Sequence, residues 1–238
     1  MKKVISICAA MLLFAYVNAQ EVSIPEIGVE APSFTAQSTM GTVKFPSDYG
    51  RNWKILLSHP KDFTPVCSSE ILEFASQQKS FDDLNTEIVF VSSDNLDQHE
   101  SWIKALEEVR YKGKDPVKIN FPILVDEAHT ISKRYGMIHS ATSVTQNIRG
   151  VYILDPDNVI RSMQFYPNEV GRDVNEIKRT LLALQATYNN DNVVAPANWE
   201  PGDDMIVPVL TQEERNKIGT PGSDYYQLTW FMVYKKSN

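Results

Sequence analysis

The stretch SHPKDFTPVCSSE, residues 58–70, joins an apolar run to an amphipathic one. The apolar run, WKILLS at 53–58, is typical of a buried central strand. Residues 66–80 place apolar side chains three and four positions apart, which predicts a helix with one face on a core. The stretch therefore predicts a strand–turn–helix unit.

Cys67 falls in the first turn of this predicted helix. Thr64 is a favourable N-cap, and Pro65 suits the first helical position because its missing N–H would have no partner there. We expect the Thr64 hydroxyl to accept a hydrogen bond from the backbone N–H of Cys67 or of its neighbour. The unpaired N–H groups and the helix dipole favour the thiolate, which is the nucleophilic form. Glu70 and Glu73 oppose it, so a cation is expected nearby; a buried, inert cysteine is the alternative.

The rest of the chain alternates strand-like and helix-like segments. Residues 87–92 are typical of a second buried strand, and residues 151–154 and 159–163 predict a hairpin around the turn residues Asp-Pro-Asp-Asn. Apolar residues at helical spacing predict further helices over 97–110 and 173–188. This alternation predicts an α/β fold.

The composition changes near residue 189, where Asn-Asn-Asp-Asn precedes a segment bearing Pro and Gly. We expect a main domain over 20–188 and a C-terminal appendage over 189–238, with strands near 205–210 and 225–234. The appendage is too poor in regularly spaced apolar residues to hold a core alone. It is expected to pack on the main domain or on a second subunit.

The first nineteen residues have the pattern of a secretory signal peptide. Lys2 and Lys3 precede an apolar run over 4–16, and small residues end at Ala19, the expected cleavage point. A membrane anchor is the rival interpretation, but the run is shorter than the ~20 residues that a spanning helix needs. We expect an exported protein, periplasmic or secreted, with no membrane attachment after cleavage.

Composition and charge limit the classes of molecule that the chain is expected to bind. Of 238 residues, 42% are apolar and 22% are charged, as in ordinary globular proteins, so the core needs no metal or disulfide. Removal of residues 1–19 takes away two lysines and no acidic residue, which moves the net charge from −7 to −9. Such an acidic chain argues against nucleic acid as a partner. Cleavage also removes Cys8 and leaves Cys67 as the only cysteine.

A metal site is not expected. The four histidines, His59, His99, His129 and His139, show no paired ligand spacing, so we predict neither a metal nor another cofactor. His59, beside Pro60, is expected to line the pocket around Cys67, and no proton-transfer role is assigned to it.

The motif Pro60-x-x-x-Thr64-x-x-Cys67 resembles the active-site motif of the peroxiredoxins. The wider stretch 58–70 is similar to the one-cysteine, peroxiredoxin-six-type subfamily. The likeness continues along most of the chain, at Ala31-Pro32-x-Phe34, residues 120–124, residues 149–156, Tyr166-Pro167, Gly171-Arg172 and residues 194–199.

The resemblance implies a thioredoxin-like fold, with a central mixed sheet flanked by helices and a small C-terminal appendage. It also implies that the Cys67 thiolate attacks a hydroperoxide, becomes a sulfenic acid and releases water or an alcohol. Thr64 would donate a hydrogen bond to the peroxide, and Pro60 would shield the thiolate from water.

The same resemblance implies that Arg149 is the expected cation. It would stabilise the thiolate and polarise the O–O bond, while Glu70 would orient this arginine together with a second one, Arg172. A solvated loop charge is the alternative for Arg149. The family also suggests a homodimer, with the appendage as a candidate arm.

Three other functions were weighed against peroxide reduction: disulfide exchange, phospholipase activity and non-enzymatic peroxide sensing or holdase activity. Because no second cysteine remains, an external thiol must reduce the sulfenic acid, and a disulfide exchanger would need a Cys-x-x-Cys motif that is missing here. Some relatives carry a phospholipase serine in Gly-Asp-Ser-Trp; here residues 50–53 read Gly-Arg-Asn-Trp, and Pro46 stands near the histidine position, so we predict no phospholipase activity. A non-enzymatic peroxide sensor or holdase using the same cysteine remains open.

Overall fold

The computed structural model describes residues 24–188, 190 and 192–237. The predicted signal peptide, residues 1–19, lies outside the described residues. Within the part of the chain that is described, no helix is long and apolar enough to cross a bilayer.

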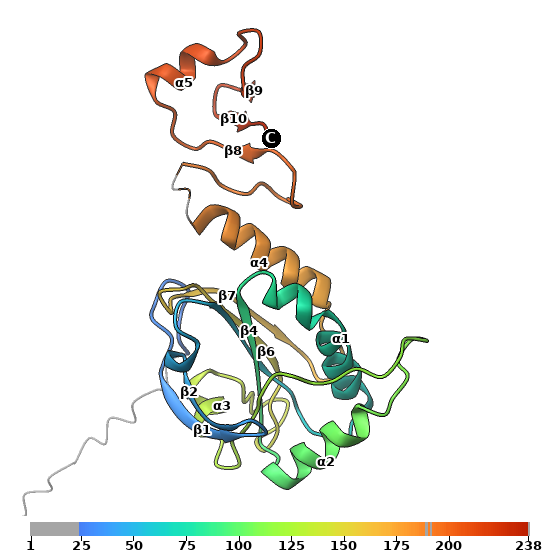
Figure 1. Ribbon diagram of the computed structural model, residues 1–238. Coiled ribbons are helices and arrows are strands. Elements are labelled where there is room, and N and C mark those ends of the chain that lie inside the picture. Colours follow the sequence, from blue (N-terminus) through green and yellow to red (C-terminus); the bar gives the residue numbers. More distant parts are fainter. Residues whose placement is uncertain (1–23, 189, 191, 238) are drawn as a thin grey trace, which may run out of the picture.

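The main body is built on a seven-stranded mixed sheet (Figure 1). Its strand order is β2-β1-β5-β4-β3-β6-β7. The three central strands β5, β4 and β3 are parallel, and every other pairing is antiparallel. The strands are β1 (Phe34–Ser38), β2 (Gly41–Phe45), β3 (Trp53–Ser58), β4 (Thr86–Ser92), β5 (Ile123–Val125), β6 (Arg149–Leu154) and β7 (Ile160–Tyr166).

Helices cover both faces of this sheet. They are α1 (Pro65–Asp82), α2 (Leu96–Leu106), α3 (Thr130–Arg134) and α4 (Val174–Tyr188), with a short 3-10 turn η1 (Ser47–Tyr49). Successive residues of a strand point to opposite faces, so Ile55 and Leu57 pack with α1, α2 and α4, whereas Leu56 packs with α3. The prediction of a thioredoxin-like α/β fold, with a mixed sheet flanked by helices, is confirmed.

One helix ends earlier than predicted. The helix predicted over 97–110 stops at Leu106. Beyond it the backbone bonds shorten to three-residue steps, and the Glu107 carboxylate accepts from Ile119 N (3.0 Å), which turns the chain away. Val109, inside the range predicted as helical, is 39% exposed.

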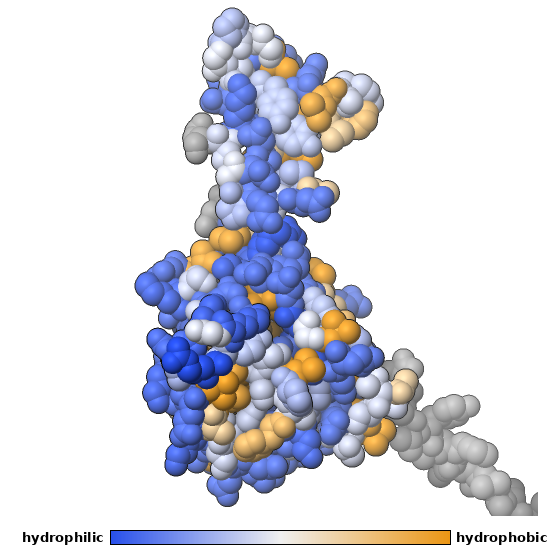
Figure 2. Space-filling model, turned by 90° about the vertical axis from the view of Figure 1, so that its right-hand side faces the viewer, coloured by the Kyte–Doolittle hydropathy of each residue, from blue (hydrophilic) through white to orange (hydrophobic). Residues whose placement is uncertain are grey.

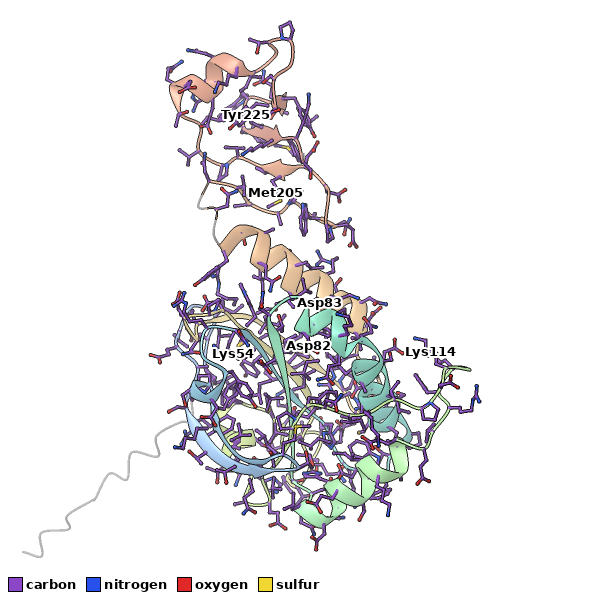
Figure 3. All side chains as sticks on the ribbon, viewed as in Figure 1. Lys54, Asp82, Asp83, Lys114, Met205 and Tyr225 are labelled. Carbon is purple, nitrogen blue, oxygen red and sulfur yellow. The ribbon has the colours of Figure 1, made fainter. Side chains whose placement is uncertain are left out.

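The C-terminal segment forms a separate small layer beyond the end of α4 (Figure 1). It contains β8 (Met205–Ile206), α5 (Gln212–Lys217), β9 (Tyr225–Thr229) and β10 (Met232–Lys235). The order of its three antiparallel strands is β8-β10-β9. Met205 and Tyr225 both lie in this layer, whereas Lys54 lies in the main body (Figure 3).

The single strand predicted over 225–234 is therefore wrong, because the chain reverses inside it. The Thr229 hydroxyl accepts a hydrogen bond from Phe231 N (3.3 Å), which stabilises a turn that contains neither glycine nor proline. Trp230 and Phe231 at this turn are 83% and 63% exposed. The segment projects as a narrow extension from the larger body, with apolar residues gathered on one side (Figure 2).

Candidate active site

The loop 59–64 connects buried strand β3 to helix α1 and carries the predicted motif. Thr64 is the extended N-cap residue of α1, and Pro65 is its first helical residue. Cys67 is consequently in the first turn, as predicted, and its side chain is fully buried. It is a free cysteine.

The Thr64 side chain does not cap the helix, so that prediction is wrong. Its hydroxyl donates to the carbonyl oxygen of Lys61 at 2.9 Å. Phe63 has a left-handed backbone, with φ of 56°, and this turn brings the chain back so that the Lys61 carbonyl lies within reach of the hydroxyl. The oxygen of Thr64 keeps lone pairs free for another donor.

Arg149 is the first residue of β6 and is 2% exposed. Its Nη1 lies 3.3 Å from the Cys67 Sγ and 2.7 Å from Glu70 Oε2. Its Nε and Nη2 donate to the carbonyl oxygen of Asn168 at 3.1 and 2.6 Å. The guanidinium is therefore held in one orientation, with one N–H edge on the sulfur.

Glu70 lies between two guanidinium groups. Arg172 donates to it through the backbone N, Nε and Nη2, at 2.8, 2.8 and 2.7 Å. The remaining Nη1 of Arg172 donates to the carbonyl oxygens of Ser58 and Gly150, both at 2.9 Å. Arg172 thus ties α1 to the ends of two strands, β3 and β6.

The charges of this cluster do not cancel. Burial raises the pKa of Glu70, but the charge and hydrogen bonds of Arg172, and then the charge of Arg149, outweigh it and hold the pKa below its ordinary range. Two buried guanidinium groups and one carboxylate leave one positive charge without a partner. A negative charge on the neighbouring sulfur would balance it.

A small cavity opens beside this cluster, with a volume of about 190 Å³. Arg149 joins the two, because it lines the cavity and also contacts the Cys67 sulfur. The lining residues are Pro60, Lys61, Thr64, Pro65, Val66, Gln146, Arg149 and Asn168. The space can hold a small polar molecule next to the guanidinium.

His59 does not line this cavity, contrary to expectation. It is fully buried, and its Nε2 lies 2.7 Å from Asp62 Oδ1. The same carboxylate contacts Nδ1 of His99, on α2, at 2.6 Å. Burial lowers the pKa of His59 despite its contact with Asp62.

The contact of Asp62 with His99 was not predicted from the sequence. The three-residue separation of His59 and Asp62 was a weak signal, whereas nothing near His99 in the sequence indicated this contact. Gln146 and Asn168 were missed as well, since they lie on loops that only the folded chain brings to the cavity.

Comparison with known proteins identifies the family of the chain. Residues 27–163 match the AhpC/TSA family, and residues 183–218 match the C-terminal domain of 1-Cys peroxiredoxin. A peroxiredoxin of Methanosarcina mazei is 44% identical over 216 residues, which cover 90% of this chain and 98% of that protein. A peroxiredoxin of Thermotoga maritima is 37% identical over 91% of this chain and 99% of its own.

Solved structures agree with the sequence relatives. The yeast mitochondrial 1-Cys peroxiredoxin superposes with a TM-score of 0.79 at 32% identity, covering 90% of this chain and all of that chain. A cysteine-to-serine mutant of peroxiredoxin 6 from Arenicola marina gives a TM-score of 0.76 at 28% identity, covering 90% and 99%. These matches show that the chain, in which a buried cysteine contacts a fixed arginine, belongs to the peroxiredoxin family and is a thiol-dependent peroxidase.

Proposed function

We propose that Cys67 is the peroxidatic nucleophile and that Arg149 is its counter-charge. The observation that carries this assignment is the charge count, because the buried cluster has one positive charge more than its carboxylate can balance. The 3.3 Å contact between Arg149 Nη1 and the sulfur supports the assignment, because it brings a positive charge to the atom that would carry the negative one.

In the first half of the reaction the thiolate attacks the distal oxygen of a hydroperoxide. The S–O bond forms as the O–O bond breaks, which gives a sulfenic acid and a leaving oxyanion that takes a proton to become water or an alcohol. Arg149 stabilises the charge that develops on that oxygen. Pro60 excludes water from the sulfur.

Thr64 contacts the peroxide from the other wall of the cavity. While its proton lies on the Lys61 carbonyl, its oxygen can accept from the O–H of the substrate. Rotation of the hydroxyl would let it donate instead. Glu70 and Arg172 hold Arg149 in place.

In the second half an external thiol attacks the sulfenic sulfur and displaces water, which gives a mixed disulfide. A second thiol then releases Cys67. The yeast structure was described as showing a thiol-resolving mechanism via glutathione/thioredoxin systems. We propose a thiol of the same chemical kind for this chain, because its sequence supplies no second cysteine after residue 8.

The test is peroxide consumption with dithiothreitol, comparing the mature chain with Cys67→Ser. Sustained turnover is expected only with the cysteine present. Equal turnover in the variant would contradict the assignment of Cys67. Consumption of about one peroxide per subunit, with excess thiol, would instead favour the sensor or holdase alternative.

Export is proposed from the sequence of residues 1–19 alone. We expect a mature chain that begins at Gln20 and occurs in the periplasm or outside the cell. Mass spectrometry of the protein from its own cells measures the N-terminus directly. A chain that retains residues 1–19 would contradict the proposal.

A homodimer is proposed on two features. Strand β7 is an outer strand of the sheet: Ile160 bonds Gly28 and Val29, but no backbone hydrogen bond from another described segment reaches the outer side of residues 161–166, and such an edge can pair with another chain. The exposed Trp230 and Phe231 give the appendage an apolar surface for a second subunit. Light scattering should give twice the chain mass, and Trp230→Ser with Phe231→Ser should lower it; a wild-type monomer at all concentrations would contradict the dimer.

A further inference from the structure

Asp62 links two parts of the fold. Its carboxylate contacts His59 Nε2 at 2.7 Å and His99 Nδ1 at 2.6 Å. The exposed fractions of His59, Asp62 and His99 are 0%, 3% and 0%. Since His99 belongs to α2 and the other two to the active-site loop, the carboxylate fastens this loop to a helix that does not contribute to the cavity lining.

The hydrogen bonds define the protons of the cluster. Burial raises the pKa of Asp62, but hydrogen bonds from His59 and His99 outweigh it and keep the carboxyl ionised. An ionised carboxylate only accepts, so each imidazole donates one N–H to it. Among the described residues, nothing bonds the opposite ring nitrogens, His59 Nδ1 and His99 Nε2, which are both buried. The proton that each ring shares with Asp62 thus lies on Nε2 in His59 and on Nδ1 in His99.

The same three side chains offer ligand atoms within 4.8 Å of one another, a set that could hold a metal ion. Their N···O separations are those of strong hydrogen bonds, and the protons occupy the position that an ion would take. Among the described residues, neither Asp62 nor the neighbouring Asp94 has an arginine or lysine partner within bonding distance. The two imidazole N–H groups therefore stabilise the Asp62 charge.

The cluster fixes the backbone that carries Thr64. Asp62 N donates to the side chain of Asp94 at 2.9 Å, so both ends of Asp62 are bonded. On one side Lys61 offers its carbonyl to the Thr64 hydroxyl, and on the other Phe63 holds its left-handed conformation. Such a conformation costs about 1 kcal/mol or more outside glycine and persists only when its surroundings impose it.

We propose that Asp62 and His99 are positioning residues for peroxide reduction, which hold the loop 61–64 so that Thr64 faces the substrate cavity. Neither residue touches the substrate, and the effect reaches it only through the loop. The inference rests on the peroxidase chemistry proposed for Cys67, and Cys67-dependent turnover of the wild type is measured first. If that turnover is missing, the proposed function fails and the positioning role is not yet in question.

The experiment compares three substitutions of His99 in the full mature chain. His99→Ala removes the N–H donor, and His99→Leu removes it while filling most of the volume. His99→Asn keeps a side-chain N–H close to the position of Nδ1. Each variant is assayed for kcat and KM with hydrogen peroxide and for the rate at which iodoacetamide alkylates Cys67.

We expect His99→Ala and His99→Leu to lose about tenfold or more in kcat/KM, because a misplaced loop group can cost as much as about a hundredfold. His99→Asn should recover to within about threefold of the wild type. Alkylation should not slow in any of them, since Arg149 and Glu70 are untouched and iodoacetamide needs no contact with Thr64.

Two results would overturn the proposal. One is a folded His99→Leu chain with unchanged kcat/KM. The other is alkylation that slows in parallel with peroxide reduction, which would indicate general damage to the site. If His99→Ala does not fold, the comparison of Leu with Asn decides the question.

Discussion

Arg149→Ala removes the positive charge in contact with Cys67. The contact distance is 3.3 Å, and with an effective dielectric constant of about 20 the attraction between unit charges is roughly 5 kcal/mol. The guanidinium charge is spread over several atoms, so about 4 kcal/mol is the better figure, which corresponds to a loss of Cys67 reactivity of at most about a thousandfold.

The assay is the rate of Cys67 alkylation by iodoacetamide at neutral pH, followed by mass spectrometry. In Arg149→Ala this rate should fall by about a hundredfold or more, because the positive charge in contact with the sulfur is gone. Arg149→Lys should lose less, because lysine keeps the charge but cannot reproduce the fork that bonds Asn168, Glu70 and the sulfur at once. Peroxide reduction should fall in the same order.

Arg110→Ala is the matched control. Its side chain is 68% exposed and pairs with the exposed Asp115, so its removal should leave the alkylation rate unchanged. Equal alkylation rates for Arg149→Ala and the wild type would refute the reasoning, because they would mean that the buried positive charge does not act on the sulfur.

Three further predictions concern stability. Glu70→Gln breaks a buried ion pair and should destabilise the chain by about 3–5 kcal/mol. Glu73→Gln, whose lysine partner is mostly exposed, should cost under about 1 kcal/mol. Urea unfolding measures both free energies, and equal losses would contradict the role given to burial. The lowered pKa of His59 means that its contribution to stability is complete above about pH 6.5 and is lost as the pH falls below that value, because the unfolded chain then binds the proton more tightly. Unfolding at pH 8 and pH 5 should show this loss, and His59→Gln, which keeps a donor for Asp62 but does not titrate, should flatten it; an equally steep loss in the variant would exclude His59. In Gly150→Ala the new Cβ would lie 3.1 Å from Ser58 Oγ and 3.3 Å from Met137 Cγ, so the free energy of unfolding should fall by about 1–3 kcal/mol. An unchanged melting temperature would show that these neighbours move aside without loss of stability.

The sequence predicted the elements that carry strong local signals. The apolar run at 53–58 became β3 without change, and the Asp155–Asn158 turn lies between β6 and β7 as expected. The proline and the helical spacing after it were enough to place Cys67 in the first turn of α1. These signals involve residues close together in the chain, so local propensity and tertiary structure agree.

Predictions that depend on side-chain direction were weaker. Thr64 has the right residue type for a cap, but its hydroxyl bonds Lys61 because the left-handed Phe63 redirects the loop. The contact of Asp62 with His99 joins residues separated by 37 positions and arises only when α2 folds against the loop. Arg149 was named through the family resemblance, since its own surroundings in the sequence do not indicate a partner 82 positions away.

The unbalanced charge beside Cys67 has a consequence for recycling. Once the sulfur carries a hydroxyl it is neutral, and the Arg149 guanidinium faces a sulfur that no longer carries a negative charge. The reductant that must enter is itself an anionic sulfur. One fixed positive charge can therefore serve two nucleophiles in succession, first by stabilising the protein's own thiolate and then by attracting the thiolate that restores it.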